Sequence, residues 1–162
     1  MKIDLGCLAK GYIADLIVAD LKQKGVSSAL LNLGGNIVGI GPEKDAWRIG
    51  IQDPTQPRNE YVTVVPIQNQ SVVTSGIYER SLEKEGQTYH HILDPKTGYP
   101  METDVVSFTI ISTNSVDGEI WTTRLYGHPA NEIINGVNQV DGIEGIVMTE
   151  DGTILYSNGL NL

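Results

Sequence analysis

The chain has 162 residues, of which 40% are hydrophobic and 19% are charged. This length and composition fit one folded domain with its own hydrophobic core, and they exclude a disordered tail and a membrane span. Lys and Arg number 11 against 20 Asp and Glu, so the net charge is −9 at neutral pH. This charge argues against a nucleic-acid partner, because binding to phosphates needs basic side chains. The single cysteine, Cys7, excludes a disulfide within the chain.

The first element is predicted to be a helix over residues 9–24. Apolar side chains recur every four residues at Ile13, Ile17 and Leu21, which is the spacing of one helical face. Gly25 follows this run, and a glycine at that place commonly ends a helix. We therefore expect an amphipathic helix at the start of the domain.

Short β-strand patterns and turn-forming residues alternate through the middle of the chain. Glycine makes up 18 of the 162 residues, an excess that favours tight turns and close backbone approaches. The proline-containing loop over residues 94–100 follows one of these strands directly, so we expect it to be rigid. The predicted strands cover residues 28–33, 37–40, 47–51, 61–67, 71–74, 87–93 and 105–112.

The end of the chain returns to helices. We expect helices over residues 116–125 and 129–140, followed by strands over 145–148 and 154–157. An order of one helix, many strands, two helices and two strands favours an α+β fold with an antiparallel or mixed sheet. We predict a single domain over residues 1–162.

Two glycine-rich segments each have two interpretations. In residues 4–12, glycine stands at the expected helix N-terminus and Lys10 lies in the first turn. The free N–H groups and the helix dipole could hold a phosphate there; the alternative is a helix-entry turn with Lys10 in solvent. In residues 32–36, the pair Gly34-Gly35 is either a hairpin turn or a close approach of the backbone to a flat ligand.

Two further segments carry polar side chains. Residues 74–80 combine two hydroxyls, a glycine, an aromatic ring and opposite charges, which suits both a polar cofactor and a plain turn between strands. His90 and His91 are neighbours on a predicted strand. Because successive strand side chains point to opposite faces, the two histidines cannot both line one site, which argues against a two-histidine metal site.

Glu119 and Thr123 are four residues apart on a predicted helix and so share one face. Carboxylate and hydroxyl oxygens are ligands that Mg²⁺ prefers. The alternative is an acid on a helix face together with a threonine bonded to its own helix. Asp117 is a second candidate ligand, although it does not share the face of Thr123.

Together, these segments resemble the ApbE-type FAD:protein FMN transferase family, also called the thiamine biosynthesis lipoprotein family. The motifs occur in the family's order over nearly the whole chain. They are Asp4-Leu5-Gly6 with Ala9-Lys10-Gly11-Tyr12, Asn32-Leu33-Gly34-Gly35, Thr74-Ser75-Gly76 with Tyr78-Glu79-Arg80, His90-His91-Ile92-Leu93-Asp94-Pro95 with Thr97-Gly98, the helix carrying Glu119 and Thr123, and Ser157-Asn158-Gly159-Leu160.

The resemblance implies an α+β fold of the tunnelling-fold type and a Mg²⁺-dependent reaction. In that reaction FAD is cut at its pyrophosphate, FMN is transferred to a threonine hydroxyl of a target flavoprotein, and AMP is released. FAD and the threonine-containing acceptor protein are therefore the implied partners. The resemblance implies His91 as the base that takes the threonine proton. It implies Glu119, Thr123 and the main-chain carbonyl of Cys7 as metal ligands, and Asp4, Lys10, Ser75, Gly76 and Asp94 as parts of the flavin site.

The chain departs from the family's pattern at three positions. The family more often has Asp in place of Glu119, a small residue in place of Cys7, and an acidic or amide residue in place of Ile77. Glu is longer than Asp by one methylene, so we expect a metal to sit differently. Family members also carry an N-terminal portion with part of the flavin pocket, so we expect this chain to be the C-terminal part, to fold alone and to bind FAD weakly.

The sequence leaves three other functions open. The chain could be a flavin-binding module or an FAD pyrophosphatase that does not flavinylate proteins, and a third interpretation is a structural interaction domain. Family members are usually exported and lipid-anchored, which implies an extracytoplasmic, membrane-anchored parent. We expect the present chain itself to be soluble, with no direct membrane contact.

Overall fold

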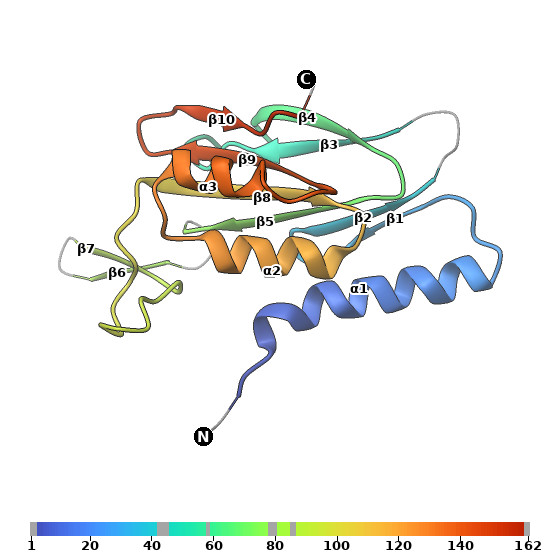
Figure 1. Ribbon diagram of the computed structural model, residues 1–162, viewed down its shortest axis with the longest axis horizontal. Helices are drawn as coiled ribbons and strands as arrows, with labels where there is room; N and C mark the ends of the chain where they lie inside the picture. Colours follow the sequence, from blue (N-terminus) through green and yellow to red (C-terminus); the bar gives the residue numbers. More distant parts are fainter. Residues whose placement is uncertain (1–2, 42–45, 58, 78–80, 85–86, 161–162) are drawn as a thin grey trace.

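The computed structural model describes residues 3–41, 46–57, 59–77, 81–84 and 87–160 (Figure 1). Its centre is a six-stranded sheet with the order β1-β2-β5-β8-β9-β10, in which every neighbouring pair is antiparallel. The strands are β1 (Ala29–Asn32), β2 (Asn36–Ile40), β5 (Ser71–Gly76), β8 (Val105–Ser112), β9 (Ile143–Thr149) and β10 (Ile154–Tyr156).

Both faces of this sheet are covered, and β8 is buried along its whole length. Successive strand residues face opposite sides, so Phe108 and Ile110 join the core cluster with the helix side. Ile111 faces the other way and packs with the hairpin formed by β3 (Trp47–Gln52) and β4 (Tyr61–Ile67). The core therefore has two halves, one on each side of the sheet.

Three helices complete the fold. They are α1 (Gly6–Gln23), α2 (Ser115–Leu125) and α3 (Ala130–Val137). α2 and α3 lie on one face of the sheet, while α1 runs antiparallel to α2 at the outside of the molecule (Figure 1). This arrangement confirms the predicted α+β class with an antiparallel sheet and packed helices. None of the described helices combines the length and the apolar character that a membrane crossing needs.

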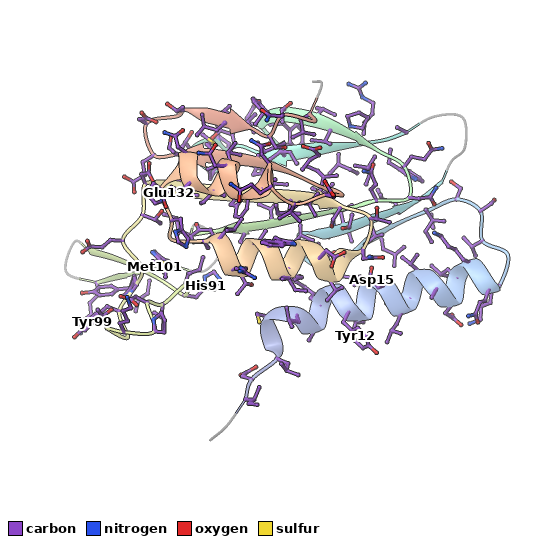
Figure 2. All side chains as sticks on the ribbon, in the orientation of Figure 1. Tyr12, Asp15, His91, Tyr99, Met101 and Glu132 are labelled. Atoms are coloured by element: carbon purple, nitrogen blue, oxygen red, sulfur yellow. The ribbon has the colours of Figure 1, made fainter. Side chains whose placement is uncertain are left out.

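The apolar stripe that predicts α1 is only partly covered: Ile13 is exposed, whereas Ile17 and Leu21 are half-buried. Gly11 and Ala14 are the buried residues of α1, whereas Tyr12, Ile13 and Leu16 are exposed. Tyr12 points away from α2 in Figure 2. The reason is steric: a Cβ on Gly11 would lie 2.7 Å from the Ser115 carbonyl oxygen, so only small side chains allow so close an approach of the two helices.

Most predicted strands are found, with differences near the candidate site. β4 and β8 have the predicted bounds, whereas the strand predicted over 87–93 ends at His90 as β7 (Gln87–His90). Its partner β6 (Ser81–Lys84) was not predicted. The apolar residue Leu93 extends the strand pattern in the sequence, but the chain has turned and Leu93 forms only an isolated bridge to Pro100.

Candidate functional site

An open cavity of about 790 Å³ lies where α1, α2, the β1–β2 turn, the end of β5 and the loop after β7 meet. His91 reaches it from that loop (Figure 2). Asp4 and Asp94 do not line this cavity, and residues 78–80 of the predicted motif lie outside the described part of the chain. The predicted site residues that line the cavity are Cys7, Lys10, Ser75, Gly76, His91, Glu119 and Thr123.

Asp4 builds the entrance to α1 instead of facing the cavity. Its Oδ1 accepts a hydrogen bond of 2.7 Å from the backbone N–H of Gly6. The contact gives a partner to the free N–H of Gly6, the first residue of α1, so the helix begins earlier than the predicted start at residue 9. Gly6 and Cys7, the first residues of the helix, therefore come to the cavity wall, where the positive end of the helix dipole favours an anion.

The β1–β2 turn confirms the hairpin interpretation of the paired glycines. Gly34 and Gly35 have φ values of +66° and +86°, which form the hairpin turn that joins β1 to β2. Gly34 also lines the cavity, and its carbonyl oxygen accepts a hydrogen bond of 3.4 Å from Lys10 Nζ. The turn thus helps to hold the lysine at the site.

Glu119 is a buried carboxylate with two nitrogen partners. Its side chain comes from the middle of α2, and the residue is only 7% exposed. Asn36 Nδ2 donates a hydrogen bond of 3.0 Å to Oε1, and Lys10 Nζ lies 3.7 Å from the same oxygen. Among the described cavity-lining residues, Lys10 carries the positive charge and Glu119 the negative one, so the two charges balance each other.

Thr123 lies one helical turn after Glu119 and lines the same cavity. Its neighbour Thr122 is buried and donates to the carbonyl oxygen of Gly118 at 2.9 Å. Asp117 does not line the cavity, and its Oδ2 accepts a hydrogen bond of 3.0 Å from Asn114 Nδ2. Of the two acids weighed from the sequence, the structure therefore brings Glu119 to the site.

The two histidines have different environments. His90 Nε2 lies 3.1 Å from the Met101 carbonyl oxygen, and His90 Nδ1 accepts from the Ile92 N–H at 3.3 Å. Both contacts are satisfied when the proton of a neutral ring is on Nε2, so His90 ties β7 to the following loop. His91 is exposed and lines the cavity just beyond the end of β7.

The end of β5 supplies hydroxyls to the cavity. Ser75 and Gly76 line it, as does Thr74, which was not among the predicted site residues. Thr74 Oγ1 lies 2.8 Å from Thr109 Oγ1 on β8, so β8 fixes its position. Its place beside Ser75 in the sequence motif is the signal that could have identified it.

Asp94 shapes the loop after β7. Its carboxylate accepts from the Lys96 N–H at 2.8 Å and from Thr97 Oγ1 at 3.3 Å, and its carbonyl oxygen accepts from the Gly98 N–H. Side-chain contacts of this kind are typical of Asp in turns. Asp94 therefore supports the loop that carries His91.

Fold and cavity together define a class of protein: an antiparallel α+β domain with an open cavity lined by both polar and apolar residues. A model of the ApbE family matches residues 1–147. The chain is 43% identical over 158 residues to an FAD:protein FMN transferase of Klebsiella pneumoniae (98% of this chain, 49% of that protein). It is 35% identical to one of Treponema pallidum (99% and 47%).

A solved structure agrees with these relatives. The crystal structure of the ApbE protein of Thermotoga maritima matches with a TM-score of 0.83 and 32% identity, covering 97% of this chain and 52% of that one. The chain belongs to the ApbE family, as its motifs predicted. It spans about half the length of the curated relatives it matches.

Proposed function

We propose that the protein is the part of an FAD:protein FMN transferase that holds the reacting groups. FAD would be cut at its pyrophosphate, FMN attached to a threonine hydroxyl of an acceptor flavoprotein, and AMP released. The observation that carries this proposal is the convergence of Lys10, Glu119, Thr123 and His91 on one cavity, in a chain whose relatives bear that name.

The pyrophosphate of FAD suits the end of the cavity formed by α1. Lys10 is partly exposed, with 44% of its side chain accessible, so its ammonium group can turn from Glu119 to a phosphate. The helix N-terminus beside Gly6 and Cys7 adds a partial positive charge. Lys10 and this helix N-terminus are therefore the groups that support anion binding here, in a protein that as a whole is strongly acidic.

The donor set at the cavity fits Mg²⁺. Glu119 supplies a carboxylate and Thr123 a hydroxyl, and the proposed third ligand is the main-chain carbonyl of Cys7, which also lines the cavity. No cluster of three or more His, Cys, Asp or Glu occurs among the described residues, so water and substrate phosphates would complete the shell, as is usual for Mg²⁺. When bound, the ion would neutralise charge on the phosphates as the bond to AMP breaks.

His91 is the proposed general base. An imidazole is the side chain that most often accepts a proton near neutral pH, and His91 combines exposure with a place in the cavity wall. It would take the proton of the acceptor threonine as that oxygen forms its bond to the FMN phosphorus. AMP would leave with the electron pair of the broken P–O bond.

One experiment distinguishes transfer from its alternatives. The protein is incubated with FAD, Mg²⁺ and a threonine-containing acceptor peptide, and the products are analysed by mass spectrometry. We expect the peptide to gain the mass of FMN, and a matched peptide with valine in place of threonine to stay unmodified. Release of AMP without a modified peptide would indicate an FAD pyrophosphatase, and bound but intact FAD a flavin-binding module.

We also propose an extracytoplasmic location for the parent protein, anchored to the membrane by a lipid. The support is the resemblance to a family of exported lipoproteins. Fractionation of cells that express the complete gene, with detection of the protein in the detergent-soluble membrane fraction and sensitivity to external protease, tests this location.

A further inference from the structure

Asn36 is a polar residue buried at the start of a strand. It is the first residue of β2 and is 0% exposed. Asparagine is depleted in strands, and a buried amide lowers stability unless its donors and acceptor are paired. Asn36 is not among the residues that line the cavity. Its presence in the core needs another explanation.

Both ends of the Asn36 amide are bonded to α2. Nδ2 donates to Glu119 Oε1 at 3.0 Å, and Oδ1 accepts from Ser115 Oγ at 2.7 Å. A carboxylate can only accept, so the NH₂ group must be the end that faces Glu119. Ser115 therefore receives the oxygen end, and the orientation of the amide is fixed from both sides.

Ser115 is itself held in place from α1. Its backbone N–H donates to Asp15 Oδ1 at 2.8 Å, and the N–H of Val116 donates to Asp15 Oδ2 at 3.0 Å. Asp15 lies on the side of α1 that faces α2 (Figure 2). One continuous set of bonds thus runs from α1 through the N-terminus of α2 and β2 to the carboxylate of Glu119.

These bonds commit one oxygen of Glu119 and leave the other open. No described group bonds Oε2, and no buried side-chain nitrogen or oxygen of the described residues lacks a partner. Oε2 must therefore be accessible from the cavity that Glu119 lines. Lys10 also approaches Oε1, but its side chain is 44% exposed, so the buried Asn36 is the better fixed donor.

We infer that Asn36 is a positioning residue: it holds Oε1 of Glu119 so that Oε2 is presented to a divalent cation in the cavity. This inference rests on the proposed function of the Glu119 site. Groups that hydrogen-bond a ligating carboxylate orient it and tune its affinity for metal. Such a role accounts for an amide at a strand position where an apolar residue would pack more simply.

The test is binding of Mn²⁺ alone, without FAD, measured by electron paramagnetic resonance on the purified protein. Asn36→Leu keeps the approximate volume and removes both hydrogen bonds, so we expect Mn²⁺ to bind about 10- to 100-fold more weakly. In a Glu119→Gln background the same change should alter the affinity by no more than about twofold, because the residue acts through Glu119. A merely structural role would weaken binding equally in both backgrounds.

A milder variant and its matched control keep the inference testable if Asn36→Leu does not fold. Ser115→Ala leaves Asn36 in place but removes the bond that orients its amide, and we expect weaker Mn²⁺ binding. Ser71→Ala is the matched control: it removes a buried hydroxyl that lies 3.0 Å from Ser112 Oγ, away from the cavity. It should lower the melting temperature without changing Mn²⁺ affinity.

The outcomes separate this inference from the proposed function. If the unmodified protein binds Mn²⁺ and the Asn36 and Ser115 variants bind it equally well, the positioning role is wrong and the metal site stands. If the unmodified protein does not bind Mn²⁺, or if Glu119→Gln does not weaken binding, the metal assignment itself is wrong and this inference fails with it.

Discussion

The helices α1 and α3 contribute to the molecule in different ways. α3 has 8 residues and buries four of them in the core, namely Ala130, Ile133, Ile134 and Val137. α1 has 18 residues, but its buried residues are only Gly11 and Ala14. The longer helix therefore buries little apolar surface fully in the described structure: Tyr12, Ile13 and Leu16 are exposed, and its other large apolar side chains are only half-buried.

The difference shows that stability and the site depend on different regions. α3 completes the core against the sheet, where burial of each large apolar side chain stabilises the fold. α1 instead brings Lys10 to Glu119, lets Gly11 approach α2 closely, and bonds the α2 N-terminus through Asp15. Variants in the two regions should therefore separate loss of activity from loss of stability.

The largest effect is expected at Glu119, where the site can be broken without the core. Glu119→Ala removes the cavity's carboxylate and should lower Mg²⁺-stimulated FMN transfer by at least about 100-fold, since loss of even a supporting group at a metal site often costs that much. Circular dichroism should show an intact fold. Asp117→Ala is the matched control, and activity lost there but retained in Glu119→Ala would contradict the assignment.

Variants of the two histidines should also separate a loss of activity from a loss of stability. His91→Ala should lower FMN transfer by about 10²- to 10⁴-fold, the usual contribution of a general base, with little change in FAD affinity. His90→Ala removes the ring that contacts Met101 and Ile92, so it should lower the melting temperature and spare most activity. Equal losses of FMN transfer in both variants would indicate that the substitutions disturb the β6–β7 hairpin and that His91 is not the base.

The helix comparison itself is tested by two truncations of large apolar side chains. Ile133→Ala in α3 creates a cavity at a fully buried position and should lower the free energy of unfolding by about 2–5 kcal/mol. Leu16→Ala in α1 changes a side chain that is 52% exposed and should stay within about 0.5 kcal/mol. Urea unfolding measures both, and similar losses would show that α1 contributes to the core after all.

A smaller effect is expected where α1 supports α2. Asp15→Ala removes two acceptors from the first turn of α2 and should destabilise the protein by about 1 kcal/mol, as for a lost helix cap. Asp20→Ala, on the same helix, removes an exposed ion pair with Lys24 and should cost no more than about 0.5 kcal/mol. Thermal melts that rank the two variants the other way would refute the capping role.

The smallest effect is a pH dependence far from the site, in the β9–β10 turn. Hydrogen bonds from Thr149 Oγ1 and the Thr153 N–H favour the charged carboxylate and hold the pKa of Asp151 below its ordinary value of 3.8. A lowered pKa means that this stabilisation is complete above pH 3.8 and is lost as the pH falls through the folded-state pKa. On acidification, the melting temperature of Asp151→Asn should therefore fall less than that of the unmodified protein. Equal falls in melting temperature for the two proteins would contradict this prediction.

The sequence by itself determined most of the elements and the family. β4 and β8 have their predicted bounds, because strand periodicity and the turn residues on either side are local signals. The motifs with Lys10, Ser75, His91 and Glu119 also come together in one cavity. These features depend on residues that are close in the sequence or on a pattern shared by a family.

Only the tertiary structure decided how the site is held. Asn36 and Glu119 are separated by 83 positions, and Asp15 and Ser115 by 100, so no local pattern connects them. The outward apolar face of α1 was equally hidden, because periodicity shows that a helix has an apolar stripe but not which side a neighbouring helix will approach. That choice was made by the missing Cβ of Gly11, which permits close contact with α2. Side-chain periodicity is a property of one segment, whereas a buried hydrogen-bond network exists only after distant segments have packed together.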